Sequence, residues 1–96
     1  MILTAVLLLT LLAGLVDSYP PQICGACLRA VQEARGSKYL WTVLKKAIIT
    51  SCDEAPIFQD WCKEDLTTYF STIFSGIREG LEDIVICKNA QACRHN

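Results

Sequence analysis

The 96-residue sequence contains only one histidine, and several features that mark particular functions are missing. This histidine, His95, stands near the end of the chain, and six cysteines in so short a chain favour disulfides over free thiols. A nucleophile with a positioned base therefore has no candidate, and we expect neither an enzyme nor a cofactor. No stripe of basic and aromatic residues indicates a nucleic-acid partner. No Asn-x-Ser/Thr sequon predicts N-glycosylation.

Long hydrophobic runs are also scarce, because only residues 2–16 form one. This run is shorter than the roughly 20 residues of a membrane span, and it ends at Asp17, before the helix-breaking segment Tyr19-Pro20-Pro21. Its length and flanks are typical of a secretory signal peptide. We therefore expect residues 1–18 to be a signal peptide and residues 19–96 to be secreted, either outside the cell or into an acidic granule or lysosome-like compartment.

All six cysteines lie in the expected mature chain, where they predict a single domain with three disulfides. They occur as three close pairs, Cys24 and Cys27, Cys52 and Cys62, and Cys87 and Cys93. Two arms of 24 residues each separate the pairs. Six cysteines allow fifteen connectivities, but two helical arms folded back on each other favour a nested pairing. On that condition the bridges are Cys24 with Cys93, Cys27 with Cys87, and Cys52 with Cys62.

The spacing of Cys24 and Cys27 also occurs in thioredoxin-like redox sites and in zinc sites. A redox site would need a strand followed by a helix, and no segment alternates with the period of a strand. A zinc site would compete with disulfide formation after secretion. We therefore expect no metal.

Hydrophobic residues recur at three- and four-residue steps along both arms, which predicts amphipathic helices. The expected helices cover residues 22–35, 38–51, 57–75 and 77–87, with a short turn before Cys93. The apolar positions are Ile23, Cys27, Leu28, Val31, Leu40, Val43, Leu44, Ala47 and Ile48 in the first arm, and Leu66, Tyr69, Phe70, Ile73, Phe74, Ile77, Leu81, Ile84 and Val85 in the second. Pro56 is expected to start the third helix. Gly36 and the pair Gly76 and Gly80 are expected to bend the two arms at the same level.

The complete cysteine pattern, with amphipathic helices between the pairs, resembles that of the saposin-like family. The pattern reads Cys24-x2-Cys27, Cys52-x9-Cys62, Cys87-x5-Cys93. The resemblance implies a saposin B-type domain over residues 19–96, which is an all-α bundle of four to five amphipathic helices in two hinged leaves with three nested disulfides. It also implies a leaf that opens on lipid, but not one single function. A signal peptide followed by one domain is more similar to stand-alone pore formers such as amoebapores than to multidomain precursors.

Charge is balanced over the mature chain but divided between its halves. Residues 19–52 carry five bases and one acid, a net charge of +4, whereas residues 53–96 carry four bases and eight acids, a net charge of −4. The basic half is suited to anionic headgroups, or to the acidic half of a second copy in a head-to-tail oligomer. Alternatively, both halves only solvate a compact monomer. Acidification would neutralise part of the acidic half.

A few residues off the apolar stripes are candidates for membrane contact. Ile49 falls between Lys45 and Lys46 on the helical wheel, and Trp61 falls away from the stripe that begins at Leu66. These four, Lys45, Lys46, Ile49 and Trp61, are the candidate lipid contacts. Trp41 borders the apolar stripe and is expected in the core. His95 is a candidate pH sensor, because amoebapores have a functional histidine before the last cysteine, although here it follows Cys93 and a solvated residue without a role is the alternative.

These observations predict a secreted protein that binds anionic membranes and permeabilises them, as an acid-activated antimicrobial or cytolytic effector. The main alternative is a protein that binds or transfers lipids, or activates a hydrolase, without forming a pore. A module that binds only proteins is the third alternative.

Overall fold

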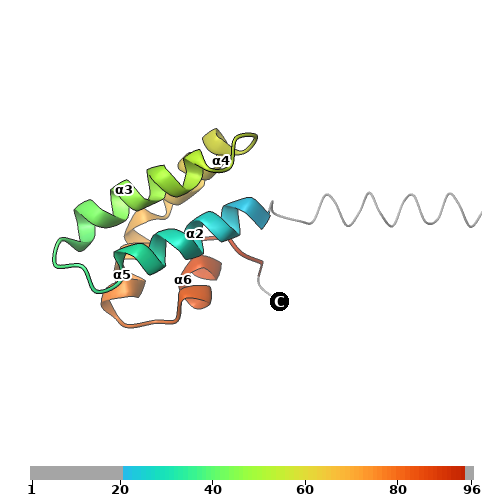
Figure 1. Cartoon of the computed structure of the whole chain (residues 1–96). Helices are drawn as coiled ribbons and strands as arrows, with labels where there is room; N and C mark the ends of the chain where they lie inside the picture. Colours follow the sequence, from blue (N-terminus) through green and yellow to red (C-terminus); the bar gives the residue numbers. More distant parts are fainter. Residues whose placement is uncertain (1–20, 95–96) are drawn as a thin grey trace, which may run out of the picture.

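The computed structural model of the protein describes residues 21–94, and every regular element in this range is a helix (Figure 1). The helices are α2 (Pro21–Ala34), α3 (Leu40–Asp53), α4 (Gln59–Thr68), α5 (Phe70–Arg78) and α6 (Asp83–Asn89). The predicted all-α fold is confirmed. None of these helices has the length and apolar composition of a membrane span. The predicted signal peptide, residues 1–18, and His95 lie outside the described residues.

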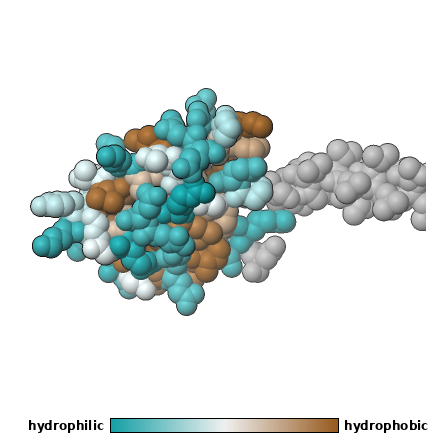
Figure 2. All heavy atoms as spheres, in the orientation of Figure 1, coloured by the Kyte–Doolittle hydropathy of each residue, from teal (hydrophilic) through white to brown (hydrophobic). Residues whose placement is uncertain are grey.

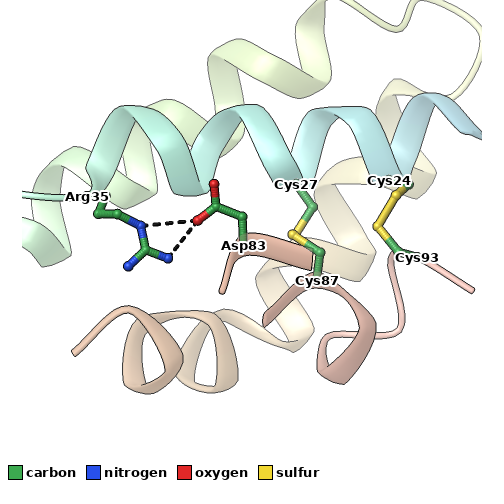
Figure 3. Close-up of a disulfide and its surroundings, with 6 residues drawn as sticks. All are labelled: Cys24, Cys27, Arg35, Asp83, Cys87 and Cys93. Carbon is green, nitrogen blue, oxygen red and sulfur yellow. Dashed lines mark hydrogen bonds and ion pairs between the residues drawn. A yellow bond between two sulfur atoms is a disulfide. The ribbon is translucent and has the colours of Figure 1, made fainter. Parts of the chain in front are cut away.

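Three disulfides divide the helices into two leaves. The bridges are Cys24–Cys93, Cys27–Cys87 and Cys52–Cys62, with Cα atoms 4.7, 5.9 and 5.5 Å apart. The first two join α2 to α6 and the segment after it (Figure 3), and the third joins the end of α3 to α4. We call α2 with α6 the first leaf and α3 with α4 the second leaf. This is the nested pairing that two equal helical arms predict, and none of the three bridges runs from one leaf to the other.

The two leaves meet where α2 packs along α3. Figure 1 shows α3 on one side of α2 and α6 on the other. The buried face of α2 carries Ala26, Ala30 and Ala34 at four-residue steps, so that a neighbouring helix can approach closely. Larger side chains fill the rest of the core, and α5 contacts α3, α4 and α6. The largest apolar side chains with almost no exposed surface are Ile23, Val31, Leu44, Leu66, Ile73 and Ile86.

The connections after α2 and after α5 both turn at glycine. Gly36 has a φ of 86° and Gly80 a φ of 77°, which are values that favour glycine over residues with a Cβ atom. Arg35 joins the two turns, because its Nη2 atom donates to the carbonyl oxygen of Leu81 at 2.7 Å and to Oδ1 of Asp83 at 2.6 Å (Figure 3). The prediction that both arms bend at the same level is therefore confirmed at Gly36 and Gly80.

The prediction of a bend at Gly76 is wrong. Gly76 lies inside α5 and is buried, and a Cβ atom at this position would stand 2.7 Å from Cγ1 of Ile86. The glycine therefore allows α6 to approach α5 closely, and it does not break the helix. The second arm breaks instead at Tyr69, between α4 and α5, and again at residues 79–82.

Two further predictions about the second arm need correction. Pro56 does not start the third helix, because residues 56–58 form a turn and α4 begins only at Gln59. Ile84 and Val85 were expected on the apolar stripe, yet they expose 39% and 38% of their surface. The new helix α6 begins at Asp83, so that the stripe of α5 does not continue in phase and Ile86 becomes buried instead.

Candidate functional site

Trp41 lies at the surface, where the two arms of the chain meet, and not in the core as predicted. It exposes 54% of its surface, and its indole meets the rings of Phe70 and Phe74 edge to face, with centroids 4.5 and 5.1 Å away. The core face of α3 is formed by Leu44, Ala47 and Ile48, among others, which leaves Trp41 at its edge. The partly buried rings of α5 cover only part of the indole, so the rest faces solvent.

A hollow of about 320 Å³ lies on one side of Trp41, between α3 and the α4 to α5 region. Its lining residues are Trp41, Lys45, Ile48, Ile49, Thr67, Phe70 and Ser71. Apolar side chains form most of this lining, while Lys45 supplies its one charge and two hydroxyl groups add hydrogen-bonding capacity. Binding sites for small ligands have this composition, and the volume of the hollow lies near the lower end of their usual range.

A second hollow, of about 420 Å³, lies on the other side of Trp41. Its lining residues are Lys38, Tyr39, Leu40, Trp41, Thr42, Phe74 and Arg78. Arg78 stands 5.7 Å from the centroid of the Phe74 ring, a cation–π arrangement that holds its guanidinium over the aromatic side chains. We call the linings of both hollows together the Trp41 surface.

The Trp41 surface carries bases but no acids. Lys38, Lys45 and Arg78 line the two hollows, and no aspartate or glutamate does. The bases come from both arms of the chain, although the sequence places the second arm in the acidic half. Folding therefore brings Arg78 from the acidic half to the hollow that Lys38, just before α3, also lines. The result is an aromatic and apolar surface whose charged groups all attract anions.

The structure brings together two of the four predicted lipid contacts. Lys45 and Ile49 line the same hollow, one turn of α3 apart, and Ile49 exposes 46% of its surface. Lys46 is exposed but lines neither hollow, and Trp61 lies on α4 near the connection to α3, with 47% of its surface exposed. His95, the predicted pH sensor, lies outside the described residues.

Sequence reasoning missed Trp41 as a surface residue because it borders an apolar stripe, and it did not predict that the partly buried Phe70 and Phe74 lie beside it. A weak signal was present in the flanks of Trp41. Lys38 and Tyr39 precede it and Lys45 follows one turn later, so that a basic edge accompanies the indole along α3. Arg78 stands one turn after Phe74 in the same way. Periodicity alone could not show that the two basic edges meet.

Within residues 21–94, Asp65 on α4 is the titratable group whose environment clearly shifts its pKa. Its Oδ2 atom is buried and receives no hydrogen bond from residues 21–94. Burial raises the pKa of Asp65 from 3.8 to about 6, because removal from water penalises the charged carboxylate. Asp65 therefore binds a proton more readily in the folded chain than in the unfolded chain. Acidification from above pH 6 to below pH 3.8 thus stabilises the packed arrangement of α4.

We expect Asp65→Asn to raise the free energy of unfolding at pH 7 and to leave it nearly unchanged at pH 4. The pKa of Asp65 is higher in the folded than in the unfolded chain, so its stabilising contribution is complete below pH 3.8 and is lost as the pH rises through about 6. The amide imitates the protonated acid at every pH. Because the side chain is partly exposed and water screens its charge, the gain at pH 7 should be about 1 kcal/mol.

Urea denaturation at pH 7 and at pH 4 measures this effect. Glu64→Gln is the matched control, since Glu64 is the exposed neighbour of Asp65 on the same helix. An equal gain in both variants would show that the change comes from lower net charge and not from the burial of Asp65.

The described residues show no other arrangement with an obvious chemistry. Within residues 21–94, no group of three or more histidine, cysteine, aspartate or glutamate side chains is placed to hold a metal ion. All six cysteines are bound in disulfides, so none offers a thiol. Comparisons with protein-family models, with curated proteins and with solved structures found no match. The Trp41 surface is therefore the candidate site.

Proposed function

We propose that this protein is a secreted, saposin-like effector that binds membranes containing anionic lipids and permeabilises them. The observation that carries the proposal is the Trp41 surface, where three bases surround exposed aromatic and apolar side chains without an acid among them. A bilayer interface offers the complementary chemistry, because anionic headgroups lie directly above apolar chains. Aromatic side chains such as tryptophan favour this interfacial zone.

Electrostatic attraction and the burial of apolar side chains should contribute similar free energies to membrane binding. Each lysine or arginine near an anionic membrane surface contributes about 1 kcal/mol to binding, and three of them line the Trp41 surface. Burial of a large exposed apolar side chain adds about 1.5 to 3 kcal/mol. Neither contribution holds a protein firmly on a membrane alone. Together they support reversible binding that depends on the anionic lipid content.

The disulfide arrangement supports both secretion and a change of shape on the membrane. Three structural disulfides are typical of proteins from oxidising compartments. Because each bridge lies within one leaf or at its end, the packing of α2 on α3 is held without a covalent bond. The leaves can therefore separate at the Gly36 turn while each stays locked. Separation would expose the apolar faces of α2 and α3 to lipid, and head-to-tail association of basic and acidic halves would then assemble several copies.

Acidification is expected to strengthen binding to anionic vesicles. Residues 53–96 carry eight acids, and protonation of some of them between pH 7 and pH 4 reduces repulsion from the membrane. Protonation of Asp65 opposes the separation of the two leaves, because it stabilises the packed form. The dependence of binding on pH should thus be steeper than that of permeabilisation.

Release of a trapped dye from vesicles tests the function. The oxidised protein comprising residues 19–96 is added to vesicles of phosphatidylcholine with or without phosphatidylglycerol, from pH 7 to pH 4. Rapid release that requires the anionic lipid supports the proposal. Vesicles that lose lipid to the protein but keep their dye would indicate a lipid carrier instead. Vesicles that neither bind the protein nor release dye would leave a protein-binding module as the remaining explanation.

A further inference from the structure

The connection between α3 and α4 presents a second apolar surface, separate from the Trp41 surface. Ile57 exposes 87% of its surface, more than any other large hydrophobic residue that the structure describes. Trp61 follows on the first turns of α4, and its ring meets that of Phe58 edge to face at 6.1 Å. Figure 2 shows hydrophobic atoms at the surface in the region where Figure 1 places this connection. We call residues 55–61 the α3–α4 wedge.

The wedge is held in one conformation by covalent and hydrogen bonds. The Cys52–Cys62 disulfide closes the connection on both sides. Within it, the backbone NH of Phe58 donates to the carbonyl oxygen of Ala55 at 3.0 Å, and that of Cys62 donates to Phe58 at 2.8 Å. The side-chain amide of Gln59 also donates, through Nε2, to the backbone carbonyl oxygen of Asp53 at 3.0 Å. A partner therefore meets Ile57 already presented, and little conformational entropy is lost when it binds.

Ion pairs compensate the acids beside the wedge. Asp53 pairs with Lys63 at 2.8 Å, and Glu54 pairs with Arg29 of α2. Asp60, exposed in the first turn of α4, is the remaining acid of residues 53–61, and it lies at the helix end where a negative charge is favourable. Glu64 and Asp65 follow one turn after Trp61 on the same helix. Residues 53–61 contain no base, and two of their three acids are paired with bases from outside the segment, so this surface has no excess of positive charge, in contrast to the Trp41 surface.

We propose that the α3–α4 wedge inserts into the interfacial zone of a lipid bilayer, and that this attachment does not require anionic lipid. The proposal rests on the proposed function, in that it supplies a second attachment for the same membrane-bound protein. Ile57 would enter the apolar chains and Trp61 would lie at the level of the headgroups, where indole rings are favoured. Binding would then depend on two properties of the bilayer, the negative charge of its headgroups at the Trp41 surface and the accessibility of its apolar chains at the wedge.

A bilayer suits this surface better than a second copy of the chain. A stable interface between proteins buries about 800 Å² on each partner, contributed by roughly 20 residues or more. The wedge presents Pro56, Ile57, Trp61 and part of Phe58, which is far less. A short, rigid apolar projection fits an interface that is fluid and needs no complementary shape.

Fluorescence of Trp61 tests the wedge directly. The sequence contains two tryptophans, so Trp41→Phe leaves Trp61 as the only one and is the parent for the fluorescence measurements, whereas dye release is measured on the protein that keeps Trp41. On vesicles of phosphatidylcholine alone, we expect the emission of Trp61 to shift to the blue and to be quenched by lipids brominated near the headgroup. Ile57→Ser in this parent should weaken partitioning at least about ten-fold, which is the effect of losing one buried large apolar side chain.

Ile84→Ser is the matched control, because Ile84 is also exposed but lies on α6 in the other leaf. It should bind like the parent. Urea denaturation measures the stability of both variants. The exposure of Ile57 predicts no loss for Ile57→Ser, whereas Ile84 exposes only 39% of its surface, so Ile84→Ser should lose some stability and still bind.

The wedge and the proposed function fail in distinguishable ways. Dye release from anionic vesicles without a change in Trp61 emission on any vesicle would overturn the wedge and leave permeabilisation standing. A blue shift that Ile57→Ser removes, together with no dye release by the protein that keeps Trp41, would support the wedge and overturn permeabilisation. Equal partitioning of Ile57→Ser and Ile84→Ser would also overturn the wedge. A blue shift that appears without vesicles as the protein is concentrated, together with a dimer in sedimentation, would assign this surface to a second copy instead.

Discussion

Lys45→Glu should reduce dye release from anionic vesicles at least about ten-fold, whereas Lys46→Glu should reduce it about two-fold or less. Reversing one charge at an anionic surface changes binding by about 2 kcal/mol when the side chain lies at the contact. Lys45 lines the hollow beside Trp41, and Lys46 does not. Neighbouring residues on a helix point about 100° apart, so Lys46 is directed away from a membrane that lies on the Trp41 surface, and salt weakens its effect.

Each variant is the control for the other, because both change the net charge by the same amount and at adjacent positions of one helix. Release is measured against protein concentration at pH 7 and about 0.15 M salt, and binding is measured in parallel by sedimentation with the vesicles. Equal losses in both variants would mean that only the net charge matters and that the Trp41 surface is not the contact. A loss confined to Lys46→Glu would place the membrane on another face of α3.

Removal of the Cys27–Cys87 bridge should greatly reduce the stability of the folded chain. Both sulfur-bearing residues are fully buried, and the bridge joins positions 60 residues apart. In the chain-entropy account such a bridge stabilises the folded state by about 4 kcal/mol, which is much of the stability that a domain of this size has. We therefore expect the double variant Cys27→Ala with Cys87→Ala to be largely unfolded at physiological temperature.

The short bridge provides the comparison. Cys52 and Cys62 lie 10 residues apart, so the same account assigns their bridge about 3 kcal/mol. The double variant Cys52→Ala with Cys62→Ala should accordingly lose about 1 kcal/mol less in urea denaturation, although both cysteines are fully buried as well. A larger loss from the short bridge would show that local packing at the α3–α4 connection outweighs the restriction of the unfolded chain.

Much of the fold followed from spacing along the chain. Equal distances between Cys27 and Cys52 and between Cys62 and Cys87 predict a nested pairing when both arms are helical. Apolar residues at three- and four-residue steps predict those helices, and Gly36 predicts the first turn. These features are local, or depend only on the length of a helix, so they can be read without knowledge of the packing.

The errors arose where two helices determine the role of a residue together. Gly76 resembles a helix break in the sequence, but it allows the close approach of Ile86 from α6. In the sequence, Ile84 and Val85 continue the apolar period of α5. In the structure, α6 begins at Asp83 with its own orientation, and both side chains are exposed. In each case the sequence gives the chemistry of a residue, and the neighbouring helix decides what that chemistry does.

The sequence by itself determined an all-helical chain with three nested disulfides, turns at Gly36 and Gly80, and a basic first half. It also singled out Lys45, Lys46, Ile49 and Trp61 as candidate lipid contacts. Only the tertiary structure decided that Trp41 lies at the surface and that Arg78 and Lys38 line one hollow beside it. The physical reason is that periodicity gives the direction of a side chain relative to its own helix axis, whereas exposure and proximity depend on how the helices pack.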